Sequence, residues 1–320
     1  MPKIAILDKI HSDGIKLLEA NPKFQYEIIE DLSKKNLVTK LCSFDGMTLR
    51  RGKIDSEILE NCKNLKVISR HGVGYDNVDT KFLKKNNITL LVTATTTSVS
   101  PAEHIMFMIL NISKGIDFYD KAVRSGKFES IMHMKNNNNF ELANKKILIV
   151  GFGRIGRKLI KRCLGFEMKV YAYDPYVDQK TIESFGGIKV NNLNDGLKEA
   201  DILSLSVPLT ETTRNMINSE KIKIMKKSAI IINTSRGGVV NEKDISEALD
   251  KKIIYGAGLD VFEKEPPDYD NPLLKNKRII LTPHAATFTK ECLSNMSIET
   301  VQNVIDFFEN KLNKSMIVKL

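Results

Sequence analysis

Short apolar runs alternate with amphipathic stretches along residues 1–92. The amphipathic stretches, such as residues 15–20 and 55–61, repeat apolar positions at helical spacing. The apolar runs have the length of strands and lie at residues 3–7, 25–29, 45–49, 66–69 and 88–92. Alternating strands and helices are typical of a parallel sheet covered on both faces. The pattern therefore predicts an α/β domain in this part of the chain.

A second αβ array follows a long helical pattern at residues 98–124. Residues 105–110 are apolar nearly all round, which is typical of a helix buried under a domain or against a second subunit. We expect a loop at the polar stretch 136–139. Six strand-like runs come next, at residues 146–150, 169–173, 201–207, 228–233, 254–260 and 278–281. Six strands with intervening helices match a complete dinucleotide-binding sheet.

The first strand of the second array ends in a glycine-rich turn. Gly151, Gly153 and Gly156 follow the run 146–150, a helical pattern follows the turn, and the next strand ends in Asp174. This order is the dinucleotide fingerprint: the glycines allow a tight turn, close approach of a pyrophosphate and close helix packing. An ordinary strand–turn–helix unit with packing glycines is the alternative. We expect a nucleotide cofactor here.

The residues around Asp174 indicate which cofactor is used. A carboxylate at this distance from the glycines binds the hydroxyls of the adenosine ribose. Pro175 and Tyr176 follow it, and no Arg or Lys stands beside it to receive the additional phosphate of NADP. We therefore predict NAD rather than NADP.

Three chemically active residues follow three later strands of the same array: Arg236, Glu265 and His284. The carboxyl ends of parallel strands face the ligand crevice, so these side chains are expected to converge. An arginine binds a carboxylate bidentately, histidine transfers protons near neutral pH, and a neighbouring carboxylate orients the imidazole. Singly, each could be an ordinary surface residue. Together they suit hydride transfer on a 2-hydroxy or 2-keto acid.

An amphipathic helical pattern at residues 290–310 closes the sequence. We expect this helix to return to the first domain, so that the second domain is inserted into the first and a cleft lies between them. The expected ranges are 1–96 and 288–320 for a substrate domain and 97–287 for an NAD-binding domain.

Composition excludes several classes of protein. Of the 320 residues, 42% are hydrophobic and 28% charged, as in folded globular proteins. No apolar run approaches the roughly 18 residues of a membrane span, and the apolar start at residues 4–7 is too short for a signal peptide. The net charge of +10 is spread along the chain, so we expect an anionic small-molecule substrate rather than nucleic acid. Four scattered cysteines (Cys42, Cys62, Cys163 and Cys292) favour a reducing cytoplasm and no metal site.

Five motifs make the sequence resemble the D-isomer-specific 2-hydroxyacid dehydrogenase family over essentially its full length. They lie at residues 70–79, 151–156, 234–238, 259–266 and 282–286. The resemblance implies a dinucleotide-binding Rossmann domain inserted into a flavodoxin-like substrate domain, both with doubly wound parallel sheets. It also implies that Arg236 orients the substrate, Glu265 is the carboxylate partner and His284 is the acid/base. Glu265 is preferred to Glu263 because the family's glutamate directly precedes a proline.

The resemblance also implies binding residues. Backbone amides at Val73 and Gly74 would hold the substrate carboxylate. Residues expected at the cofactor, besides the three glycines and Asp174, are Arg154, Ile155, Val207, Pro208, Thr234 and Asp260.

The substrate is less closely defined. Arg50 ends a predicted strand at the position where 3-phosphoglycerate dehydrogenases of this family bind the substrate phosphate, and a solvated arginine is the alternative. Hydroxypyruvate, glyoxylate, lactate and branched 2-keto acids stay open, as does an NAD-sensing, corepressor-like binding protein. The sequence ends soon after the last helix, so we expect no appended regulatory domain. We expect a homodimer that assembles through residues 98–124.

Overall fold

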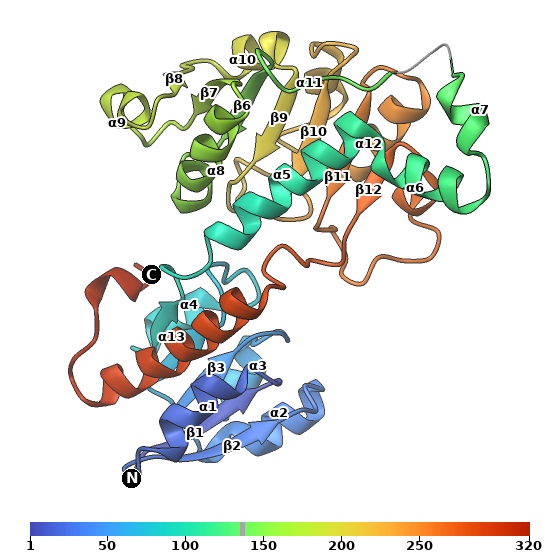
Figure 1. The fold of residues 1–320 in the computed structure, drawn as a ribbon. Helices are drawn as coiled ribbons and strands as arrows, with labels where there is room; N and C mark the ends of the chain where they lie inside the picture. The colour runs from blue at the N-terminus through green and yellow to red at the C-terminus, as the bar shows by residue number, and fades with distance from the viewer. Residues whose placement is uncertain (135–137) are drawn as a thin grey trace. The chain divides into compact units, whose positions relative to one another are not determined.

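The computed structural model describes residues 1–134 and 138–320, and these form two compact units (Figure 1). Unit 1 comprises residues 1–97 and 287–320, and unit 2 comprises residues 98–286. Each boundary lies one residue from the expected one. Residues 136 and 137 of the expected polar loop lie outside the described residues.

Unit 1 contains a five-stranded parallel sheet with the order β2-β1-β3-β4-β5. The strands are β1 (Lys3–Leu7), β2 (Gln25–Ile29), β3 (Gly46–Leu49), β4 (Val67–Arg70) and β5 (Thr89–Val92). The helices are α1 (Ser12–Glu19), α2 (Lys34–Lys40), α3 (Ser56–Leu59), α4 (Thr80–Lys85) and α13 (Lys290–Phe308), with short 3₁₀ turns at Leu41–Ser43 and Lys314–Met316. This is the flavodoxin-like strand order, whose connections change direction between β1 and β3.

Both faces of the unit 1 sheet are buried. Successive strand residues point to opposite faces, so Ile4 and Ile6 pack with α13, whereas Ala5 and Leu7 pack in a separate cluster with α2 and α3. The expected return of the last helix is confirmed. It packs so closely on α1 that a Cβ added to Gly14 would lie 2.2 Å from Ser297 Oγ.

Unit 2 contains a seven-stranded parallel sheet with the order β12-β11-β10-β9-β6-β7-β8. The strands are β6 (Lys146–Val150), β7 (Lys169–Tyr173), β8 (Ile188–Lys189), β9 (Ile202–Leu205), β10 (Ile230–Asn233), β11 (Gly256–Leu259) and β12 (Ile279–Leu281). This is the Rossmann order with one further strand, and the predicted fold class is confirmed. The expected number of strands, six, is one short because β8 has only two residues and no apolar run.

Helices cover both faces of the unit 2 sheet (Figure 1). The helices of the unit are α5 (Val99–Lys114), α6 (Ile116–Arg124), α7 (Phe128–Met132), α8 (Arg154–Gly165), α9 (Gln179–Ser184), α10 (Leu193–Glu199), α11 (Ser219–Lys223) and α12 (Glu242–Asp250), with a 3₁₀ turn at Pro272–Lys275. Ile147 and Ile149 face α5 and α8, while Leu148 and Val150 face α10 and α12. This double burial explains why the strands read as unbroken apolar runs.

The single helix expected at residues 98–124 is wrong. The chain turns at Gly115, which has a left-handed φ of +62° and ends α5 before α6 begins. Helical periodicity continues on both sides of this glycine, which is why the sequence pattern hides the break. Within the described residues, no helix combines the length and the hydropathy needed to cross a bilayer.

Candidate active site

Three adjacent strands of unit 2 bring Arg236, Glu265 and His284 to the same edge of the sheet. Strands β10, β11 and β12 are neighbours, and each residue lies in the loop that follows one of them. In a parallel sheet these loops share the carboxyl edge.

His284 and Glu265 form a hydrogen-bonded pair. His284 Nδ1 lies 2.8 Å from Glu265 Oε2, and the Phe262 amide donates to Glu265 Oε1 at 3.1 Å. Burial acts to raise the pKa of Glu265, but the bond to His284, the charge of His284, the Phe262 amide and the charge of Arg236 outweigh it. The pKa of this carboxyl therefore lies below its ordinary value. Glu265 is thus a carboxylate at neutral pH, and His284 Nε2 is left as the ring nitrogen that can exchange a proton with a ligand.

The Arg236 loop is fixed against the Glu265 loop. Asn233 at the end of β10 accepts from the Ser235 amide at 3.0 Å and donates to the Arg236 carbonyl at 2.9 Å, which closes a tight turn. A Cβ added to Gly237 would lie 1.9 Å from the Phe262 carbonyl oxygen, so only glycine allows the loops to pack this closely. Half-buried Arg236 is thereby held near Glu265.

The backbone of His284 is held by the buried Asp260. His284 has φ +54°, and its amide donates to the Asp260 carbonyl at 2.7 Å. The Asp260 carboxylate accepts from the amides of Ala285 and Ala286 and from the Thr282 hydroxyl. The expected cofactor-edge residue Asp260 is thus fully buried, and its side chain organises the loop of His284. The sequence does not predict this network, because the spacing of Asp260 and residues 282–286 along the chain does not indicate that the loops after β11 and β12 are hydrogen-bonded to each other.

The glycine-rich turn has the shape expected for a pyrophosphate site. Gly151 has φ +92°, and a Cβ there would meet the Ser206 carbonyl at 2.4 Å. A Cβ on Gly156 would meet the Gly151 carbonyl at 2.6 Å, whereas a Cβ on Gly153 would meet nothing within 4 Å. Gly153 therefore leaves open space at the start of α8, where no capping side chain covers the first amides. Arg154 and Ile155 form the first turn of this helix.

The remaining cofactor candidates lie at the same edge. Asp174 follows β7 and accepts from the amides of Phe152 at 2.8 Å and Tyr176 at 2.9 Å, so the acid is fixed beside the glycine turn. Val207 and Pro208 follow β9, and the side chain of Val207 would contact a Cβ on Gly151. Thr234 follows β10 and is buried. These residues fit a dinucleotide.

Arg50, Val73 and Gly74 lie at the carboxyl edge of the unit 1 sheet, after neighbouring strands β3 and β4. Arg70 joins their loops: its guanidinium donates to the carbonyls of Leu49, Arg50 and Gly74 at 2.6–2.8 Å. The Arg50 guanidinium donates to the Lys9 carbonyl at 2.9 Å, and Val73 is 45% exposed.

Residues 106–286 match the family described as D-isomer specific 2-hydroxyacid dehydrogenase, NAD binding domain. The chain belongs to this family. It is 36% identical over 325 residues to a glyoxylate reductase of Thermococcus litoralis, covering 99% of this chain and 97% of that protein. It is also 38% identical over 292 residues to a D-3-phosphoglycerate dehydrogenase of Methanocaldococcus jannaschii, covering 91% of this chain but only 54% of the longer relative. The family resemblance of the sequence motifs is confirmed.

The fold agrees with solved members of the family. A D-lactate dehydrogenase from Aquifex aeolicus, complexed with NAD and lactic acid, superposes with a TM-score of 0.89 at 29% identity over 98% of both chains. The family match places NAD binding in unit 2, as the glycine fingerprint predicts.

Proposed function

We propose that this protein is an NAD-dependent oxidoreductase that interconverts D-2-hydroxy acids and 2-keto acids. The observation that carries the proposal is the His284–Glu265 pair at 2.8 Å, with Arg236 held nearby on the adjoining loop. A general acid/base, its carboxylate partner and a carboxylate-binding cation thus lie at one edge of an NAD-binding sheet. The names of the relatives, which include glyoxylate reductase and D-3-phosphoglycerate dehydrogenase, agree with this class of reaction.

The proposed roles follow from the chemistry of each group. NADH, when bound, supplies a hydride for the carbonyl carbon of a 2-keto acid. Arg236 binds the substrate carboxylate and polarises the carbonyl group. His284 donates a proton from Nε2 to the carbonyl oxygen, and Glu265 stabilises the imidazolium through Nδ1. In the oxidative direction His284 removes the hydroxyl proton.

We assign cofactor binding to residues at the carboxyl edge of unit 2. Gly151, Gly153, Arg154, Ile155 and Gly156 would cradle the pyrophosphate at the start of α8. Val207, Pro208, Thr234 and Asp260 would border the cofactor. Asp174 would bind the ribose hydroxyls, and its carboxylate supports NAD over NADP because it repels a ribose phosphate.

Unit 1 is proposed as the substrate domain. The amides of Val73 and Gly74 would bind the substrate carboxylate. Arg50 would contact a substrate phosphate if the substrate is 3-phosphoglycerate. A neighbouring carboxylate weakens the case for a phosphate at Arg50. Asp8 lies 3.8 Å from Arg50 and accepts two hydrogen bonds from Arg51. Small acids such as glyoxylate, hydroxypyruvate or lactate are the alternative substrates.

A substrate panel with NAD(H) tests the proposal. It contains glyoxylate, hydroxypyruvate, pyruvate, phenylpyruvate and, in the oxidative direction, 3-phosphoglycerate. We expect turnover of at least one, and loss of about 10²- to 10⁴-fold in kcat for His284→Ala with NADH binding retained. Near-normal turnover by His284→Ala would refute the assigned role. Inactivity across the panel, combined with tight NADH-dependent binding to a protein or DNA, would favour a corepressor-like sensor.

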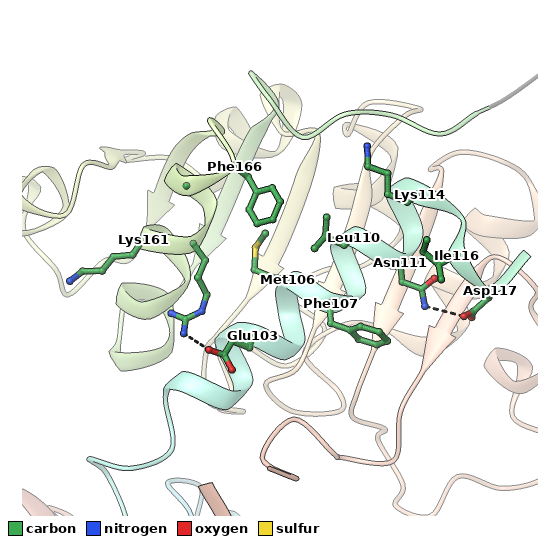
Figure 2. Close-up of a pocket in the computed structure, with 12 residues that line it drawn as sticks. Glu103, Met106, Phe107, Leu110, Asn111, Lys114, Ile116, Asp117, Lys161 and Phe166 are labelled. Carbon is green, nitrogen blue, oxygen red and sulfur yellow. Dashed lines mark hydrogen bonds and ion pairs between the residues drawn. The ribbon is translucent and has the colours of Figure 1, made fainter. Parts of the chain in front are cut away.

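We further propose that the protein is a homodimer assembled through α5, α6 and α8. A groove of about 700 Å³ between these helices is lined by apolar side chains (Figure 2), among them Met106, Phe107, Leu110 and Phe166, and by polar and charged ones, among them Glu103, Lys114 and Lys161. Phe107 is 51% and Phe166 43% exposed. Contiguous apolar surface of this kind marks an association site. A second copy is the occupant that the family resemblance suggests.

The protein is proposed to act in the cytoplasm. Its four cysteines are unpaired, and burial raises the pKa of the Cys62 and Cys292 thiols to about 11, which makes them unreactive. Free thiols suit a reducing compartment.

A further inference from the structure

In every hydrogen bond of the buried Asp260 carboxylate, the donor and the acceptor can be assigned. It accepts from the Ala285 amide at 2.7 Å, from the Ala286 amide at 2.9 Å and from the Thr282 hydroxyl. An ionised carboxylate can only accept, so the Thr282 hydroxyl must use its one proton on Asp260. The oxygen of Thr282 is then available only as an acceptor.

His104 on α5 supplies the donor that this oxygen accepts. His104 Nε2 lies 3.0 Å from Thr282 Oγ1, so Nε2 carries a hydrogen. The same nitrogen is 3.6 Å from Asp260 Oδ1, and the imidazole is only 16% exposed. His104 therefore donates to Thr282, Thr282 donates to Asp260, and the two amides that follow His284 donate to the same carboxylate.

This network holds a strained segment. His284 has φ +54°, a conformation that is unfavourable for a non-glycine residue and persists only where surrounding bonds fix it. The second tie from α5 is Ser100, whose hydroxyl donates to the Ala286 carbonyl at 2.6 Å. Helix α5 is thus hydrogen-bonded to the loop on both sides of Ala285, at Thr282 and at Ala286.

We propose that His104 is a positioning residue for His284. Through Thr282 and Asp260 it fixes the loop that aims the His284 imidazole at Glu265 and at the substrate oxygen. It touches neither substrate nor cofactor in this role. The inference rests on the proposed function, because it assumes that His284 transfers the proton.

The experiment compares two variants that break the hydrogen-bond network with two conservative variants that keep it. His104→Leu removes the donor, whereas His104→Gln keeps a donor at the place of Nε2. Thr282→Val removes the hydroxyl, whereas Thr282→Ser retains it. For each variant one measures kcat, KM for the keto acid, Kd for NADH, the thermal midpoint and the solvent deuterium isotope effect on kcat.

We expect His104→Leu and Thr282→Val to lose about 10- to 100-fold in kcat, because displacement of a catalytic group by about 1 Å has effects of this size. The Kd for NADH should change less than about twofold, since the pyrophosphate turn is separate from this loop. The solvent isotope effect should rise as proton transfer becomes limiting. His104→Gln and Thr282→Ser should recover most of the lost kcat.

A merely structural role would give a different result. Loss of folded enzyme lowers kcat and the thermal midpoint together but leaves the isotope effect of the surviving enzyme unchanged. That pattern, or wild-type kcat in His104→Leu, would overturn the inference. His284→Ala is assayed beside these variants. If it loses activity while His104→Leu does not, the positioning role fails and the proposed function stands; if wild-type protein turns over no keto acid, the proposed function itself fails.

Discussion

The Glu265 carboxylate keeps its charge although it is partly buried, because the bond and charge of His284 outweigh the burial and hold its pKa below the ordinary value. Because the pKa of Glu265 lies below its ordinary value, the carboxylate stays ionised and bonded to His284 Nδ1 down to mildly acidic pH. Reduction of a keto acid should therefore persist as the pH falls, until the pH approaches the lowered pKa of Glu265.

Glu265→Gln tests this electrostatic role. The amide has nearly the same shape but no charge, so kcat for reduction should fall about 10- to 100-fold. In the wild type, kcat/KM should decline as the pH falls toward the lowered pKa of Glu265, whereas the amide of Glu265→Gln does not titrate and should show no such decline. The measurement is a pH profile of keto-acid reduction from about pH 3 to about pH 8. A Glu265→Gln profile with the same decline at low pH as the wild type would leave Glu265 with a role in packing only.

Asp174 is the residue on which the choice of NAD depends. Both of its oxygens already accept a backbone amide, from Phe152 and Tyr176, so the carboxylate is fixed before any ribose arrives. Asp174→Ser should raise KM for NADH about tenfold or more, since a hydrogen bond to a charged group contributes about 1.5–3 kcal/mol. Efficiency with NADPH should rise relative to NADH because the repulsion of the additional phosphate is gone. Wild-type protein that uses both cofactors equally would contradict the assignment.

At the scale of elements, the start of α8 can be tested apart from the stability of the fold. A Cβ at Gly153 would meet no atom of the protein within 4 Å, and its φ of −75° suits any residue. Gly153→Ala should therefore unfold at the wild-type temperature and yet bind NADH at least about tenfold more weakly, because the methyl group occupies the approach of the pyrophosphate. Gly165→Ala, at the other end of the same helix and equally open, is the matched control and should bind NADH normally. Equal NADH affinity in both variants would remove the pyrophosphate from this turn.

Elements were predictable from sequence where burial imposes a pattern. The strands of both sheets are buried on two faces and appear as apolar runs, and the glycine turn after β6 is specified by local backbone geometry. The edge strand β8 carries no such run because Ile188 is 53% exposed. The break at Gly115 leaves the apolar spacing intact on both sides. His104 pairs with Thr282 across 178 positions, and a contact of that kind leaves no trace in local periodicity.

At the scale of the whole molecule, the chain leaves the first sheet at α5 and returns with α13, so the unit with the dinucleotide turn is an insertion in the unit with the Arg50 loop. A long connection of this type keeps each sheet continuous. On the side of α5, α6 and α8 that faces away from the unit 2 core, several apolar side chains stay exposed: Phe107, Ile116 and Phe166 are all 43% exposed or more.

The proposed homodimer makes a prediction about this face. Phe166 is a better target than Phe107, because the Phe107 ring lies 5.8 Å from that of His104 and its loss could disturb the active-site loop. Phe166→Asp replaces an apolar ring of the groove with a charged group, and both the lost apolar contact and the desolvation of the carboxylate would weaken an interface here. We expect light scattering after gel filtration to give twice the chain mass of 36.1 kDa for the wild type and the chain mass itself for Phe166→Asp. Tyr269→Asp, at a fully exposed aromatic residue that does not line the groove, is the control and should stay dimeric. A wild-type protein of 36.1 kDa, or a Phe166→Asp variant that is still a dimer, would move the interface away from these helices.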